Sequence, residues 1–243
     1  MDRDALQALR SQIYSMEKVL VTMRAYMDQY IQNAATEDTL GDLSLGVENS
    51  LETLLKRFSP EVKERQVQAY EEIVPGVCVG FSSEAGSFYC SAKTDTYHDD
   101  ANIEDPAAGT SCLLIHPNLD PEHPLTYFTL ETDVSIDGLR EINNLTLDFV
   151  PAFNSRTDEL VGSFSLFLRL YFPDSTHLDY HNQSYPVMGI PLGFSYHLQE
   201  SQYEALPLGE AIGARIIINL PRSINDLNRI LVSSFAIVGD KVE

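Results

Sequence analysis

Apolar and polar side chains alternate from Val77 to the end of the chain, and this period of two is the one that β-strands require. The alternation predicts about nine strands, at residues 77–81, 87–92, 111–116, 127–134, 145–153, 161–172, 185–198, 215–220 and 230–238. No segment between them carries the pattern of a crossover helix, which parallel neighbours would need. We therefore expect antiparallel sheets that pack as a β-sandwich with a jelly-roll-like topology.

Residues 6–34 carry a different pattern, in which apolar side chains recur at alternating intervals of three and four residues, as in the heptad seam of a coiled coil. The members of the seam are Leu6, Leu9, Ile13, Met16, Leu20, Met23, Met27, Tyr30 and Ala34. A helix of this length is roughly 40 Å long and needs a partner along its seam. We therefore predict a homo-oligomer formed through residues 6–34. The alternative is a monomer in which this helix packs on the next helix or on the sandwich.

Two more helices are predicted between this seam and the first strand. Residues 40–58 carry a weaker amphipathic pattern, which Gly41 and Gly46 interrupt. A third helix begins with Ser59 as its N-cap and Pro60 at its first position, and it runs to about residue 73. We therefore divide the chain into a helical stalk for oligomerisation at residues 1–75 and a β-sandwich binding domain at residues 76–243.

The chain of 243 residues is strongly acidic, with 36 aspartate and glutamate residues against 16 lysine and arginine residues and a formal net charge of -20. Such a surface repels nucleic-acid phosphates and anionic lipid headgroups, so we expect neither nucleic acid nor a membrane as a partner. The first residues lack the features of a signal peptide, and no apolar run approaches the ~20 residues of a membrane span. These features predict a cytoplasmic protein, with export by a signal-less route as the alternative.

The three cysteines, Cys78, Cys90 and Cys112, have neither the even number of a disulfide framework nor the spacing of a zinc site. We interpret them as small, buried apolar residues. Because residues 77–81 and 87–92 are expected to pair through a turn at residues 84–86, a disulfide between Cys78 and Cys90 is the alternative.

The alternation also assigns side chains to the two faces of the strands at residues 127–134, 161–172 and 215–220. The set expected in the core is Phe128, Leu130, Val134, Leu166, Leu168, Leu170, Phe172, Ile216, Ile218 and Leu220. If these strands are neighbours, the opposite face presents Tyr127, Glu131, Arg169, Tyr171, Arg215 and Asn219. The simpler interpretation of that face is a solvated surface with cross-strand ion pairs, such as Glu131 with Arg169 or Arg215.

Those outward side chains are chemically suited to sugars, because tyrosine rings stack on sugar rings while arginine, glutamate and asparagine bond to hydroxyl groups. A second candidate is the loop at residues 179–185, where Tyr180 and Tyr185 flank a run of hydrogen-bonding side chains. In architecture the chain resembles the jelly-roll carbohydrate-binding modules, which implies recognition of a glycan. The chain contains no tryptophan, the usual stacking platform for a sugar.

An acidic loop between the second and third predicted strands offers oxygen donors of the kind that calcium binds. The candidate ligands are Asp95, Asp99, Asp100, Asn102 and Glu104. The loop lacks the glycine and the distal glutamate of an EF-hand, so it is not a member of that class. We predict that the protein requires no cofactor. A structural calcium ion in this loop is the alternative to a solvated acidic loop.

The sequence contains no G-x-S-x-G, P-loop, G-x-G-x-x-G or H-E-x-x-H motif, so nothing in it indicates an enzyme. We expect a non-catalytic module that binds carbohydrate through a β-sandwich presented on an oligomerising stalk. Two alternatives remain. One is a structural fibre or surface-assembly subunit that contacts protein, and the other is an accessory domain of a separate enzyme.

Overall fold

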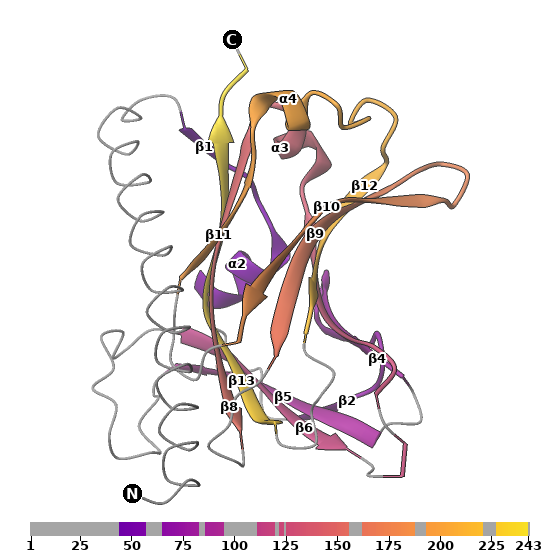
Figure 1. Cartoon of the computed structure of the whole chain (residues 1–243), viewed down its shortest axis with the longest axis vertical. Helices are drawn as coiled ribbons and strands as arrows, with labels where there is room; N and C mark the ends of the chain where they lie inside the picture. The colour runs from indigo at the N-terminus through magenta and orange to yellow at the C-terminus, as the bar shows by residue number, and fades with distance from the viewer. Residues whose placement is uncertain are drawn as a thin grey trace, which may run out of the picture. The chain divides into compact units, whose positions relative to one another are not determined.

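The computed structural model describes residues 44–56, 65–82, 86–94, 111–119, 122–123, 125–155, 162–187, 193–220 and 227–242. The chain divides into two compact units, Met1–Ser44 and Leu45–Glu243. The second unit contains two β-sheets packed face to face (Figure 1). This arrangement confirms the predicted β-sandwich.

One sheet has seven strands and the other has six. The order in the seven-stranded sheet is β11 (Phe194–Leu198), β8 (Leu145–Ser155), β13 (Leu227–Asp240), β6 (Ser111–Leu119), β5 (Gly86–Thr94) and β2 (Arg65–Val67), and β1 (Ser44–Gly46) also pairs with β13. The order in the six-stranded sheet is β10 (His177–Pro186), β9 (Ser163–Tyr171), β12 (Gly213–Asn219), β7 (Phe128–Val134), β4 (Val77–Phe81) and β3 (Glu72–Val74). Strands β2 to β13 all pair with antiparallel neighbours.

Aromatic side chains join the two sheets across the core. The ring of Phe164 on β9 lies 5.8 Å from that of Phe149, 5.6 Å from that of Phe153 and 4.9 Å from that of Phe194, all three of which belong to the opposite sheet. Each of these rings is almost fully buried, and burial of such large apolar side chains is the main stabilising term of a sandwich. The inward residues predicted on β7, β9 and β12 are buried as expected, and so is Leu220, whereas Phe172, which follows β9, is only partly buried.

Helix α2 (Ser50–Lys56) packs between the two sheets and contacts β13 and β6 of one sheet and β7 of the other (Figure 1). Its apolar side chains Leu51, Leu54 and Leu55 are buried. The backbone N–H of Leu51 donates to Thr132 Oγ1 at 2.9 Å, and the N–H of Glu52 donates to Asn49 Oδ1 at 2.8 Å. The helix is therefore fixed to β7 by a hydrogen bond as well as by apolar packing.

Two short helices lie together at one end of the sandwich, α3 (Ile136–Arg140) and α4 (Glu200–Tyr203) (Figure 1). The buried Tyr203 hydroxyl donates to the carbonyl oxygen of Leu139. Arg140 donates to the carbonyl oxygens of Leu208 and Ala211 at 3.1 and 2.9 Å. These bonds fix the connection that follows α4 onto the end of the sheets.

The helix predicted at residues 40–58 is confirmed only over α2 (Ser50–Lys56), and the helix predicted at residues 59–73 is wrong in its described part. In the described part of that region the chain forms β1, the short helix α2, and the strands β2 and β3. Val67 and Ile73 are buried in the sheets, and the pairing of β2 with β5 and of β3 with β4 overrides the local helix signal. The compact unit therefore begins at Leu45 rather than at residue 76, whereas the heptad seam lies outside the described residues.

Strands β4 and β5 do not form the predicted hairpin. Strand β4 pairs with β3 and β7 in the six-stranded sheet, and β5 pairs with β2 and β6 in the other sheet. The connection that was predicted to be a hairpin turn therefore joins strands of different sheets. Cys78 on β4 is a free, buried thiol, so it is not in a disulfide with Cys90. Cys112 is likewise free and buried. The segment predicted as one strand at residues 185–198 is also divided, between β10 and β11 in opposite sheets.

Candidate functional site

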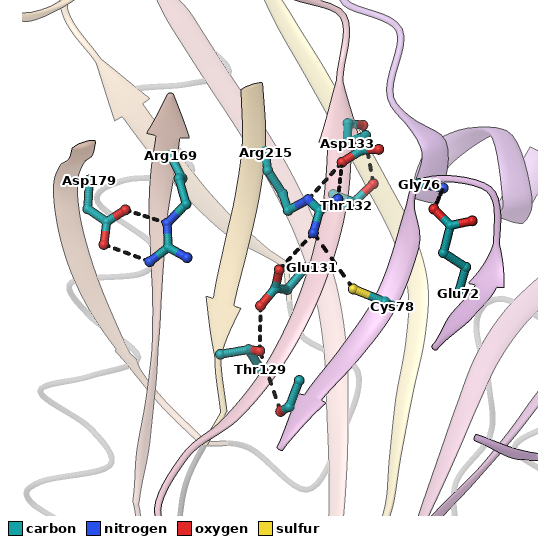
Figure 2. A network of polar contacts seen from close by, with 11 residues as sticks. Glu72, Gly76, Cys78, Thr129, Glu131, Thr132, Asp133, Arg169, Asp179 and Arg215 are labelled. Carbon is teal, nitrogen blue, oxygen red and sulfur yellow. Dashed lines mark hydrogen bonds and ion pairs between the residues drawn. The ribbon is translucent and has the colours of Figure 1, made fainter. Parts of the chain in front are cut away.

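A row of charged side chains crosses the outer face of the six-stranded sheet (Figure 2). Asp179 on β10 lies opposite Arg169 on β9, Arg169 lies opposite Arg215 on β12, and Arg215 lies opposite Asp133 on β7. Strands β7, β9 and β12 are thus neighbours, with β12 in the middle, which was the condition for a shared face. We call these four residues the charged row.

Both arginines of the charged row are held by carboxylates. Arg169 forms a bidentate ion pair with Asp179, in which Nε donates to Oδ1 at 2.6 Å and Nη2 donates to Oδ2 at 2.9 Å. Arg215 donates from Nε to Asp133 Oδ1 at 2.7 Å and from Nη1 to Glu131 Oε2 at 3.0 Å. Such charge-assisted bonds fix both guanidinium groups in place before any ligand arrives.

The pKa values of the two arginines are both raised. For Arg169 the main cause is its hydrogen bonding to Asp179. Burial by itself lowers the pKa of Arg215, but hydrogen bonds to Asp133 and Glu131 outweigh that effect. Both groups therefore stay charged, and each charge is already balanced by a carboxylate.

Glu131 was expected to be an exposed member of this face, but it is only 3% exposed. Its carboxylate accepts from Thr129 Oγ1 at 2.9 Å as well as from Arg215 (Figure 2). Its two neighbours across the sheet are Cys78 and Ile217, which are 3% and 1% exposed. The outer face thus has a buried layer of its own, formed by Glu131, Cys78 and Ile217.

Burial in this layer raises the pKa of the Cys78 thiol to about 11, and the nearby Glu131 carboxylate adds to the shift. The guanidinium of Arg215 lies 3.8 Å from the sulfur and acts in the opposite direction. The thiol therefore stays protonated at neutral pH and acts as a small apolar group, as the sequence suggested.

Two aromatic rings accompany the arginines of the charged row. The guanidinium carbon of Arg215 lies 6.0 Å from the ring centroid of Tyr171, and that of Arg169 lies 5.6 Å from the ring of Phe167. These distances are those of cation–π contacts. Tyr171 was a predicted site residue, whereas Phe167 was not, although its alternation with the core residues Leu166 and Leu168 places it on the outer face.

A pair of tyrosines lies on another part of the same sheet. The rings of Tyr70 and Tyr127 are stacked with their centroids 6.2 Å apart, and Tyr70 is 52% exposed. Burial and a hydrogen bond to Tyr127 raise the pKa of Tyr70, so its hydroxyl remains protonated. Sequence analysis missed Tyr70 because it placed this residue inside the predicted helix at residues 59–73.

Gly80 makes room for the ring of Tyr70. A Cβ atom at this position would lie 2.8 Å from Tyr70 Cε1 and 2.4 Å from Thr129 Oγ1. The backbone of Tyr70 has a φ of 61°, a left-handed conformation that is unfavourable for a tyrosine. Its N–H donates to the carbonyl oxygen of Val79 at 2.8 Å, which holds the strained residue against β4.

Asn219 lies on the outer face of β12 opposite Ser165 and Thr129, and it is partly exposed, as predicted. Tyr185 does not lie on the outer face. It is buried in the core with its ring 5.4 Å from that of Phe164, and its hydroxyl donates to the carbonyl oxygen of Ser195 at 2.8 Å.

Tyr180 does not join the face either, because it lies opposite the inward-facing Leu168. The predicted recognition loop at residues 179–185 is in fact most of the edge strand β10. In this strand only alternate side chains reach the outer face, which is why the two tyrosines are separated from Arg169 and Tyr171.

The predicted calcium ligands Asp95, Asp99, Asp100, Asn102 and Glu104 lie outside the described residues. Within the described ranges, no group of three or more histidine, cysteine, aspartate or glutamate side chains is arranged to hold a metal ion. In that same part of the chain, no helix has both the length and the apolar character needed to cross a membrane.

No protein-family model matches this sequence, and no curated protein matches it. The fold is similar to that of the Stig cyclase Fisc from Fischerella sp. TAU in complex with (3Z)-3-(1-methyl-2-pyrrolidinylidene)-3H-indole. The TM-score is 0.51 at 9% identity, over 82% of this chain and 100% of the cyclase chain. This likeness shows a shared β-sandwich fold.

Carbohydrate-binding modules are also among the structural neighbours. The C-terminal family 22 module of Clostridium thermocellum Xyn10B gives a TM-score of 0.41 at 11% identity, over 70% of this chain and 90% of the module. The family 11 module from Clostridium thermocellum, in complex with a beta-1,3-1,4-mixed-linked tetrasaccharide, gives a TM-score of 0.38 at 8% identity, over 74% of this chain and 98% of the module. The chain spans only 19% of the bacteriophage CBA120 tailspike protein 4 chain and 29% of the Xyn10B CBM22-1-GH10 chain that it also matches.

Proposed function

We propose that this protein is a non-catalytic module that binds a glycan on the outer face of its six-stranded sheet. The observation that carries the proposal is that one sheet face combines partly exposed aromatic rings with a row of fixed charged groups. Sugar rings present flat apolar C–H faces together with hydroxyl groups that both donate and accept hydrogen bonds. Aromatic rings pack against the first, and carboxylates, guanidinium groups and amides bind the second.

The charged row supports this proposal because it is rigid. Arg169 and Arg215 are each held by at least one carboxylate, and Glu131 is held by two donors. A guanidinium has five N–H donors, so donors remain after its carboxylate is bound. Because these side chains are already fixed, they lose little conformational entropy when a ligand binds, which lowers the free-energy cost of binding.

The aromatic side chains are spread over the face. Tyr171 and Phe167 belong to β9, whereas the Tyr70–Tyr127 pair lies next to Gly80 on β4. Strands β12 and β7 separate β9 from β4. A ligand that touches both groups therefore crosses several strands, which suits an oligosaccharide better than a single sugar.

The predicted self-association through residues 6–34 completes this proposal. Several copies of one weak site on an oligomer raise the apparent affinity for a repetitive ligand without any new contact. The proposal does not depend on this step, because the face is built from one chain.

The experiment is a glycan-array screen of the full chain, followed by calorimetry with the best oligosaccharide. We expect Tyr171→Ala and Arg169→Ala each to weaken binding by about tenfold or more, since each removes a contact worth roughly 1.4 kcal/mol. Tyr185→Phe is the matched control, because it removes only a hydroxyl from a core tyrosine. An array without any carbohydrate ligand, or equal binding by all three variants, would overturn the proposal.

A further inference from the structure

The charged row leads into a groove of about 570 Å³ between α2 and the turn that joins β3 to β4. Asp133 belongs to both, because it binds Arg215 in the row (Figure 2) and also lines the groove. Ligand pockets in proteins commonly measure roughly 300–1,000 Å³. The groove is therefore large enough to hold a sugar unit at one end of a ligand that lies along the row.

The lining of the groove is apolar on its walls and acidic in charge. Leu54 of α2, Val74 and Pro75 provide apolar surface suited to the C–H face of a sugar. Glu48 and Asp133 provide two carboxylates, of which that of Asp133 is shared with Arg215, a cation that Glu131 also balances. None of the described residues that line the groove is basic. Glu48 is exposed, and its carboxylate has no basic partner in the described part of the chain.

An anionic ligand would find no free positive charge here. The first N–H groups of α2 are already bonded, that of Leu51 to Thr132 Oγ1 and that of Glu52 to Asn49 Oδ1. The two arginines of the charged row are balanced by carboxylates. The formal charge of -20 on the whole chain adds a long-range repulsion of anions.

From this charge complementarity we infer that the groove is a terminal subsite for a sugar unit that bears a protonated amino group. The ligand class is then an amino-sugar oligosaccharide with at least one free amine. This inference rests on the proposed binding of glycan by the outer face. The ammonium group lies between Glu48 and Asp133, while the sugar ring packs on Pro75 and Val74.

Calorimetry on the full chain with three oligosaccharides of equal length tests the inference. The probes are a glucosamine oligomer with free amines, its fully N-acetylated form, and a glucose oligomer of the same linkage. The measurements are made at about pH 6, where the sugar amines carry a positive charge. We expect the free-amine oligomer to bind about three- to tenfold more tightly than the other two. This preference falls as salt is added, because Glu48 is exposed to solvent.

Glu48→Gln removes one charge from the groove without removing any bond that the described structure assigns to that side chain. We expect it to abolish the preference for the amine and to leave binding of the N-acetylated oligomer unchanged. Asp174→Asn, on the exposed β9–β10 connection, makes the same change in net charge away from the groove and should leave the preference intact.

The outcomes separate the two proposals. If oligosaccharides bind and depend on Tyr171 but the amine brings no preference, the subsite is wrong and the proposed function stands. The subsite is also wrong, and the proposed function stands, if Glu48→Gln keeps the preference for the free amine. If none of the oligosaccharides binds, and none binds on the array, the proposed function fails and the subsite fails with it.

Discussion

Arg215 Nη1 lies 3.0 Å from Oε2 of Glu131, a carboxylate that is almost fully buried although it projects from the outer face of a sheet. This pair joins β12 to β7 in the middle of the sheet. A second pair, Arg169 with Asp179, joins β9 to β10 at the sheet edge. The arginine side chains are equally exposed, at 23%, but the carboxylates are 4% and 43% exposed, so the two pairs make a matched test of burial.

We predict that Arg215→Met lowers the free energy of unfolding by about 3 kcal/mol, because it leaves the buried Glu131 charge without its partner. Arg169→Met should cost about 1 kcal/mol or less, because Asp179 can be solvated. Urea denaturation of both variants at pH 7 measures the difference. Equal losses would show that burial of the carboxylate does not decide the value of these pairs.

Because the pKa of the Cys78 thiol is raised, we predict that the protein loses stability at alkaline pH. At neutral pH it is protonated in the folded and the unfolded chain, so it contributes no pH dependence. Above its ordinary pKa of 9.0 the unfolded chain releases the proton first, whereas the folded chain retains it until about 11. The unfolded state is thereby favoured between these values, by on the order of 2 kcal/mol. Between pH 8 and pH 10.5 the free energy of unfolding should fall less for Cys78→Ala than for the unaltered chain. Equal falls in the two proteins would contradict this account.

We predict that replacing Tyr70 weakens ligand binding without lowering the stability of the fold. Asparagine tolerates the left-handed backbone of residue 70 better than tyrosine, and the ring that it removes is half exposed. Tyr70→Asn should therefore leave the free energy of unfolding within about 0.5 kcal/mol of the original or raise it. It should weaken oligosaccharide binding by about tenfold, whereas Tyr70→Phe keeps the ring and most of the affinity. Thermal denaturation and calorimetry on both variants check the two effects, and an unchanged affinity in Tyr70→Asn would remove this residue from the site.

We predict a large effect on stability from Phe164, because its ring packs near three aromatic rings of the opposite sheet and near that of Tyr185 on the neighbouring strand β10. Phe164→Ala should cost about 3–5 kcal/mol by leaving a cavity between the sheets. Tyr185→Phe, which removes only the hydroxyl bonded to Ser195, should cost about 1 kcal/mol and leave binding intact. Chemical denaturation measures both losses. Loss of glycan binding in Tyr185→Phe would show that the core assignment of this tyrosine misses a role in recognition.

The heptad seam predicts self-association. Light scattering of the full chain should give a multiple of the monomer mass, whereas a chain that begins at Leu45 should give the mass of a monomer. A monomeric full chain would remove the avidity step from the proposed function and leave the binding face itself untouched.

The alternation of side chains was enough to predict the strands at residues 127–134, 161–172 and 215–220, because the direction of a side chain in a strand depends only on its position along that strand. It also placed Arg169, Tyr171, Arg215 and Asn219 on one face. It assigned Tyr180 and Tyr185 to a loop, because the strand that contains them is polar and lies at a sheet edge.

The sequence by itself therefore determined a sandwich of antiparallel strands and most members of one polar face, since both follow from local periodicity. Only the tertiary structure decided that β4 and β5 lie in different sheets, that residues 65–67 and 72–74 form strands, and that Glu131 is buried beside Cys78. These features depend on pairing between segments far apart in the chain, and pairing energy can override a local helix or turn preference. The place of Tyr70 beside Tyr127 has the same origin, because a hydrogen bond to Val79 on β4 holds its strained backbone.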